Sequence, residues 1–439
     1  MHLLHDNRLL FSAATSIEAW DLDSLTPASF NNLHEQKEDM LRSYLTNTKI
    51  PRALIIIPQQ HSRGSLQITS GAFGILTTDL STFPGFQQVV SSFTRDGSDG
   101  YISRPGAYFN QRSDGRFSNK RFEASFLLKY VARNHRKVTH MDLLDEIPQW
   151  SVRQQGIYQL HNTVNKTKIS TTILINPSDV LCHQIKQNHG PSVSNQYKHE
   201  DWTSVITLAF ESISANWTDY IACFNRAFER LKRDALATDP KRPNTGDADT
   251  QSLKAALEIM DKLQVASHVL ESNIRTIRAV YKESEIRSSL WQHAQQLVEK
   301  ERFANCVDTV TQDLEFQLSQ VQSLMTRLNA VAAIVRDLVS LRNTHTMEKM
   351  TARTVLEAHT MRVIALLTLC FLPPTFIAGF LDMGYINITS AKGLIKVDVE
   401  PGLWLYLSIS LPLVFFIMSA YLLWDRRNMR RANESNSRV

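Results

Sequence analysis

The stretch VIALLTLCFLPPTFIAGFL, residues 363–381, contains no Asp, Glu, Lys, Arg or His, and Asp382 follows it at once. A second run, LWLYLSISLPLVFFIMSAYLLW at residues 403–424, is equally free of these residue types. Each run is close to the ~20 residues that a helix needs to cross the ~30 Å of hydrocarbon in a bilayer. The sequence therefore predicts an integral membrane protein with two transmembrane helices, residues 362–381 and 403–424, joined by a loop at residues 382–402.

The charges that flank the two runs predict the topology. Basic residues precede the first run and follow the second, whereas the loop between the runs carries Lys392 and Lys396 against Asp382, Asp398 and Glu400. The positive-inside rule then places both termini in the cytosol, with residues 425–439 as a basic cytosolic tail and residues 382–402 outside. The loop also contains an N-x-T glycosylation sequon at Asn387, which favours the plasma membrane over the mitochondrial inner membrane.

The first 245 residues have the composition of a soluble domain. Short β-rich segments at residues 53–58, 66–78 and 169–175 alternate with polar segments, and residues 201–238 have the apolar spacing of one helix. Residues 95–120 are rich in Gly, Ser and Arg and predict a surface loop. We therefore expect a mixed α/β cytosolic domain with flanking helices over residues 1–245.

Residues 246–361 predict a stalk of long helices. Residues 247–372 contain no glycine and no proline, the two residue types that most often interrupt helices. Within this range apolar residues recur in a heptad pattern, which predicts a helix that packs against a partner along its length. We call these positions the a/d seam: Val307, Val310, Leu314, Gln317, Val321, Leu324, Leu328, Val331, Val335 and Leu338, with Gln317 as the one polar exception.

No catalytic motif accompanies these elements. The sequence has no phosphate-binding G-x-x-x-x-G-K-[ST], no H-E-x-x-H and no C-x-x-C, and its four cysteines have no paired spacing. The net charge of +5 is modest for 439 residues, and we expect no nucleic-acid partner. The sequence therefore predicts no enzyme and no resident cofactor, and it leaves two functions open: a channel, or a membrane-anchored scaffold that uses its long helix to bind partners.

The segment MRVIALLTLCFLPPTFIAGF, residues 361–380, resembles the pore helix of the CorA-type magnesium and divalent cation transporters. Upstream segments at residues 150–162, 214–231 and 261–277 are similar, more specifically, to the CorA-like proteins of filamentous fungi. The resemblance implies an α+β cytosolic domain followed by long helices and two C-terminal transmembrane helices. It also implies a homopentamer whose first transmembrane helix lines a pore for divalent cations, with Mg²⁺ as the transported and regulatory ion.

Carried over residue by residue, the resemblance implies a stripe of pore-lining side chains on the first transmembrane helix. Their spacing of three and four residues fits one helical face. The apolar members would gate by dewetting, and the threonines would offer hydroxyl groups to a hydrated ion. We call these residues the pore stripe: Met361, Ile364, Ala365, Thr368, Leu372, Thr375 and Gly379.

The sequence departs from the family at the mouth of the pore. The family has a Gly-Met-Asn signature there, whereas this chain has Asp382, Met383 and Gly384. Five copies of Asp382 would form a carboxylate ring that binds hydrated magnesium in place of the lost asparagine. Alternatively, Asp382 only marks the end of the span, and the protein is a non-conducting scaffold or sensor that retains the architecture.

Overall fold

The computed structural model describes residues 10–22, 27–33, 41–42, 52–59, 64–93, 106–113, 120–134, 149–164, 167–188, 203–237, 246–286, 294–382 and 401–436. Contacts between residues divide the chain into two compact units, Met1–Val339 and Ser340–Val439. This division falls inside residues 246–361, the predicted stalk, and the predicted domain boundaries stay predictions.

The first unit contains a seven-stranded sheet with the strand order β2-β1-β3-β7-β6-β5-β4. Only β3 and β7 run parallel, and the other neighbours pair antiparallel. The inner strand β3 is buried at five of its six positions, as expected for a strand that is covered on both faces. The strands are β1 (Thr15–Asp21), β2 (Pro27–Leu33), β3 (Arg52–Ile57), β4 (Ala107–Ser113), β5 (Lys120–Arg133), β6 (Trp150–Val164) and β7 (Thr167–Ile175).

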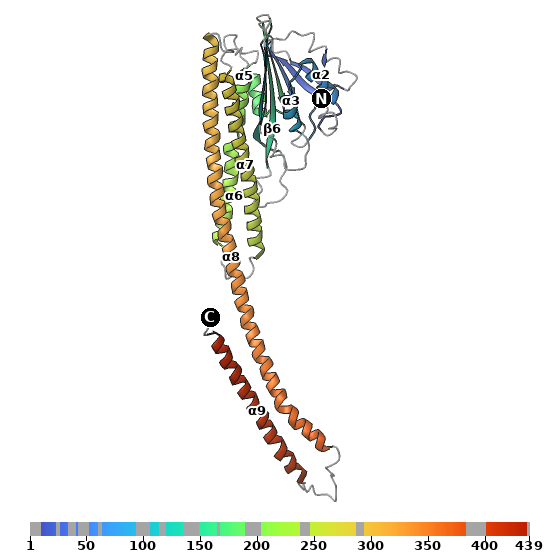
Figure 1. Ribbon diagram of the computed structural model, residues 1–439, viewed down its shortest axis with the longest axis vertical. Helices are drawn as coiled ribbons and strands as arrows, with labels where there is room; N and C mark the ends of the chain where they lie inside the picture. Colours follow the sequence, from blue (N-terminus) through green and yellow to red (C-terminus); the bar gives the residue numbers. More distant parts are fainter. Residues whose placement is uncertain are drawn as a thin grey trace. The chain divides into compact units, whose positions relative to one another are not determined.

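Helices cover both faces of the sheet (Figure 1). On one face, α2 (Ser70–Asp79) and α3 (Pro84–Ser91) form a core with alternate residues of β3, β6 and β7. On the other face lie α4 (Asp179–Asn188), α5 (Ser204–Ser214), α6 (Trp217–Ala237), α7 (Gly246–Ile286) and the first half of α8 (Ala294–Asp382). The unit is therefore a three-layer α/β/α arrangement in which the long helices extend one outer layer.

The a/d seam of α8 is buried against helices of the same chain. Nine of its ten residues, all except Leu338, are less than one-tenth exposed and belong to or border the core with α5, α6 and α7. Phe303 stacks on Phe210 of α5 at 6.0 Å between ring centroids. The polar exception Gln317 has its Nε2 3.5 Å from the carbonyl oxygen of Ser214, the last residue of α5. The partner that the heptad pattern predicts is therefore intramolecular within this unit.

Charged side chains close the rim of this helix bundle. The Arg327 guanidinium pairs with Glu229 of α6 at 2.7 Å and lies over the Phe228 ring, 4.5 Å from its centroid. Arg278 of α7 pairs with Glu315 of α8. These contacts are exposed, so each adds little stability.

Three sequence-based expectations for this unit are wrong. Residues 66–78 contain α2 rather than a strand, because the Thr69 hydroxyl caps the helix by accepting a hydrogen bond from the Ala72 N–H at 3.1 Å. The single helix predicted for residues 201–238 is broken into α5 and α6, since Asn216 adopts a left-handed φ of 67°. The predicted loop at residues 95–120 contains strand β4, while residues 94–105 and 114–119 lie outside the described residues.

The second unit contains the last part of α8 and the helix α9 (Pro401–Asn436). Figure 1 shows α9 in red, running back along the end of α8. The Tyr406 hydroxyl of α9 donates a hydrogen bond to the carbonyl oxygen of Pro374 in α8 at 3.4 Å. The predicted fold class, an α+β domain followed by long helices and two C-terminal apolar helices, is confirmed.

Candidate functional site

Both helices of the second unit are long and apolar enough to cross a membrane, one candidate span lying within Val298–Gly379 and the other over Trp404–Leu423. Many of their large apolar side chains are exposed in the described part of the chain: Phe376, Phe415 and Phe416 are 75%, 76% and 72% exposed. Soluble proteins rarely expose such a continuous apolar surface to water. These helices therefore mark the protein as a membrane protein, in agreement with the sequence.

All seven residues of the pore stripe lie on α8 in the second unit, and none is buried in the single chain. At 100° per residue they fall within about 120° of one another around the helix axis. Met361 and Leu372 are each 69% exposed, and Ile364 is 52% exposed. The stripe is thus an available helix face, and its assignment to a pore stays a prediction.

The two threonines of the stripe direct their hydroxyl hydrogens toward the helix backbone. Thr368 Oγ1 is 3.1 Å from the Ile364 carbonyl oxygen and 2.9 Å from that of Ala365. Thr375 Oγ1 is 2.9 Å and 3.0 Å from the carbonyl oxygens of Phe371 and Leu372. Because a hydroxyl has one donor and two acceptor lone pairs, each oxygen remains available as an acceptor for the protons of a hydrated cation.

The predicted pore mouth is described only in part. Asp382 is the last residue of α8. Met383 and Gly384 lie outside the described residues. The proposed metal-binding role of Asp382 therefore stays a prediction.

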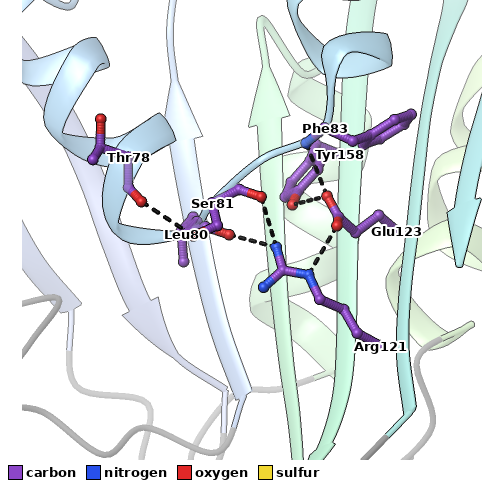
Figure 2. A network of polar contacts seen from close by, with 7 residues as sticks. All are labelled: Thr78, Leu80, Ser81, Phe83, Arg121, Glu123 and Tyr158. Carbon is purple, nitrogen blue, oxygen red and sulfur yellow. Dashed lines mark hydrogen bonds and ion pairs between the residues drawn. The ribbon is translucent and has the colours of Figure 1, made fainter. Parts of the chain in front are cut away.

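The first unit contains a fully buried carboxylate, that of Glu123 on β5, and Figure 2 shows its contacts. Glu123 Oε2 accepts hydrogen bonds from the Phe83 N–H and the Tyr158 hydroxyl, each at 3.0 Å. Glu123 Oε1 accepts from Arg121 Nε at 2.8 Å, and Arg121 also donates to the carbonyl oxygens of Leu80 and Ser81. Burial, followed by the Glu123 charge, raises the pKa of Tyr158, so this hydroxyl stays protonated.

This network fastens the turn between α2 and α3 to the sheet. Ser81 has a left-handed φ of 48°, and the Arg121 guanidinium bonds its carbonyl oxygen and that of Leu80. Both oxygens of the Glu123 carboxylate are used for protein contacts. A buried charge that is paired and hydrogen-bonded in this way stabilises local structure, and we assign the network no part in ion binding.

A second polar contact joins the long helix α7 to the edge of the sheet. Strand β4 pairs with β5 as far as Phe126, and among the described residues no strand pairs with β5 beyond it on that side. There the Asn273 side chain of α7 accepts from the Lys129 N–H at 2.9 Å and donates to the Lys129 carbonyl oxygen at 2.7 Å. Asn273 thus takes the place of a β4 residue, and nothing in the sequence pattern identifies this role.

The described part of the chain shows no group of three or more His, Cys, Asp or Glu side chains that could bind a metal ion. The four cysteines are free thiols. Burial raises the pKa of Cys182 to about 11 and that of Cys306 to about 12, so neither forms a reactive thiolate at neutral pH. Within the described residues, the pore stripe is therefore the best candidate for contact with ions.

No protein-family model and no curated protein sequence matches the chain. The chain is similar to the complete structure of the CorA magnesium transporter from Methanocaldococcus jannaschii, at 11% identity and a TM-score of 0.31, over 93% of this chain and 98% of that one. It is also similar to the cytoplasmic domain of ZntB from Vibrio parahaemolyticus RIMD 2210633, at 12% identity and a TM-score of 0.32, over 72% of this chain and 98% of that one.

A third similar structure is the full-length CmaX protein, at 12% identity and a TM-score of 0.39, over 95% of this chain and 98% of that one. The CorA transporter belongs to the family that residues 361–380 resemble. TM-scores below 0.5 are too low to transfer a function from one chain to another.

Proposed function

We propose that this protein is a CorA-like membrane channel for divalent cations, with Mg²⁺ as the main cargo, and that five copies of α8 line its pore. The observation that carries the proposal is the pore stripe. It is an exposed face of a membrane-spanning helix on which small and apolar residues alternate with two threonines whose oxygens can accept. Such a face offers acceptor oxygens between apolar rings to a hydrated ion, which contact with lipid alone does not require.

The chemistry of the stripe suits an ion that keeps its water shell. Mg²⁺ gives up its waters reluctantly, and its bound waters donate hydrogen bonds. The hydroxyl oxygens of Thr368 and Thr375 can accept them at two levels of the pore. Rings of Met361, Ile364 and Leu372 would close the pore by excluding water when the helices approach one another.

Asp382 supplies the negative charge at the outer mouth in this proposal. It follows the apolar run directly, so a ring of its carboxylates would concentrate cations at the entrance of the pore. In this orientation both termini lie in the cytosol, and the sequon at Asn387 lies outside, consistent with the plasma membrane. Mg²⁺ would act both as cargo and as a regulatory ion that binds between subunits.

The structure weakens one argument for the alternative function, a non-conducting scaffold or sensor. The sequence argument for a scaffold relied on an a/d seam that could bind another protein. Within the first unit this seam is buried against α5, α6 and α7. Among the described residues, most of the exposed large apolar side chains lie on the two apolar helices of the second unit, where a membrane and other copies of the chain would cover them.

The test is Mg²⁺ influx into liposomes that contain the purified protein, with cobalt hexaammine as a mimic of the hydrated ion. We expect flux that cobalt hexaammine blocks, and a loss of at least half of the flux at low external Mg²⁺ in Asp382→Ala. Asp398→Ala, in the same loop, is the matched control and should conduct as the wild type does. Unaltered flux in Asp382→Ala would refute the carboxylate ring. Absence of flux from an intact pentamer under a driving potential would favour the scaffold.

A further inference from the structure

Two consecutive prolines weaken α8 near its outer end. Pro373 and Pro374 lie inside the helix and have no N–H group, so the backbone bonds that they would make to the carbonyl oxygens of Leu369 and Cys370 are missing. In a membrane, freed carbonyl groups have no water to bond, and neighbouring helices and hydroxyl side chains must take over. The segment 375–382 is therefore joined to the rest of α8 by fewer hydrogen bonds than an ordinary helix end.

One side-chain contact across the proline pair comes from the next residue of the same helix, and it reaches other carbonyl oxygens than the two that the prolines leave without an N–H partner. The Thr375 hydroxyl lies within hydrogen-bond distance of the carbonyl oxygens of Phe371 and Leu372, one turn earlier. This contact spans the proline pair along the helix. It does not fix the direction in which the segment 375–382 leaves the pair, because it involves α8 alone.

The second contact comes from α9. The Tyr406 hydroxyl donates to the carbonyl oxygen of Pro374, the last residue of the proline pair, at 3.4 Å. The neighbouring residues Trp404 and Leu405 are 70% and 55% exposed, whereas Tyr406 is half-buried. Tyr406 is thus turned toward α8. Its hydroxyl oxygen contacts the proline pair, directly before residues 375–382, which form the end of the helix.

We propose that Tyr406 is a positioning residue: its hydroxyl ties α9 to the proline pair and so sets the direction of residues 375–382, which carry Thr375, Gly379 and Asp382. The O···O distance of 3.4 Å exceeds the ~2.7–2.8 Å of a strong hydroxyl bond, so the tie can open and close at small cost. The expected effect of Tyr406 on ion flux rests on the proposed channel function. Its expected effect on the direction of residues 375–382 does not depend on that function.

The first experiment measures hydrogen–deuterium exchange of the full-length protein in lipid nanodiscs, comparing the wild type with Tyr406→Phe. The change removes only the hydroxyl oxygen and keeps the ring. We expect about threefold faster exchange in peptides that cover residues 375–382, the factor typical of one hydrogen bond between membrane helices. Exchange in α6 and in residues 411–423 should not change. Ser408→Ala, an exposed hydroxyl on the same helix, is the matched control and should exchange as the wild type does.

Equal exchange in the wild type and Tyr406→Phe would overturn the proposal. So would faster exchange spread over all of α8 and α9, because that result describes general loosening rather than a tie at one point. The second experiment is block of Mg²⁺ flux by cobalt hexaammine, which we expect to weaken about threefold in Tyr406→Phe while the oligomer stays intact. If the wild type does not conduct, the channel proposal fails, and the exchange result alone decides the role of Tyr406.

Discussion

Lys129 on β5 is a lysine buried in the sheet, 4% exposed, and burial lowers its pKa from 10.5 to about 8. The ammonium form is therefore disfavoured in the folded protein. Between pH 8 and 10.5 the unfolded chain binds more protons than the folded one, so the free energy of unfolding should rise with pH in this window. Below pH 8 the cost of burial is fully present.

Replacing this residue in Lys129→Met should raise the free energy of unfolding at pH 7 by up to about 3 kcal/mol, since one pKa unit corresponds to about 1.4 kcal/mol. The advantage should shrink as the pH rises toward 10.5. Urea titrations of both proteins in detergent, at intervals from pH 7 to 10, measure the difference. The quantity to compare is the difference in free energy of unfolding between the variant and the wild type at each pH. Burial raises the pKa of Cys182 and Cys306, so both proteins lose stability above pH 9, and this loss cancels in the difference. Lys282→Met on the surface of α7 should show no such trend, and an equal trend in both variants would contradict the assignment to Lys129.

At the scale of elements, α7 and β5 are joined by the Asn273 side chain, which is 1% exposed. Asn273→Ala removes two buried hydrogen bonds, those to the N–H and to the carbonyl oxygen of Lys129, and we expect the free energy of unfolding to fall by about 2–6 kcal/mol, at ~1–3 kcal/mol for each bond. Urea unfolding measures the loss. The exposed Asn225→Ala on α6 should change stability by less than ~0.5 kcal/mol. If both variants lose the same amount, Asn273 does not act through the two buried groups.

The sequence predicts the elements in which packing and local preference agree. The strands β3 and β7 follow from their β-rich apolar runs, the helices of residues 247–372 from the absence of glycine and proline, and the a/d seam from its heptad period. It misses α2, because two glycines and several β-branched residues in LQITSGAFGILTT disfavour a helix, while burial of Phe73 and Leu76 favours one. It also misses β4. The residues of this strand are largely polar, and they form an edge strand because they pair with β5.

The candidate site was predictable to a similar extent. The pore stripe is implied by the family resemblance of residues 361–380; its seven residues lie on an exposed face of α8, and their assignment to a pore stays a prediction. The contacts of Tyr406 and Asn273 were not predictable, because each joins residues more than thirty positions apart, and no local pattern specifies the partner. The Glu123 network was missed for the same reason.

At the scale of the whole molecule, the chain divides after Val339 into one unit whose apolar residues are largely covered and one whose apolar residues are largely exposed. The a/d seam ends at this division: Val335 is 2% exposed, and Leu341, the first large apolar residue beyond it, is 53% exposed. A fragment of residues 1–339 retains every contact that buries the seam. A fragment of residues 1–382 adds an uncovered apolar helix that needs lipid.

We therefore expect the fragment 1–339 to be soluble without detergent and to unfold cooperatively on heating, followed by circular dichroism. The fragment 1–382 should aggregate unless detergent is present, because it exposes the apolar helix to water. Leu328→Asp in the shorter fragment is the control for the seam. It places a charge at a fully buried position of α8, and since an unpaired buried charge is strongly unfavourable, the variant should be unfolded or insoluble. If the wild-type fragment 1–339 folds only in detergent, the seam alone does not stabilise the bundle, and the apolar helices must contribute to the stability of the first unit.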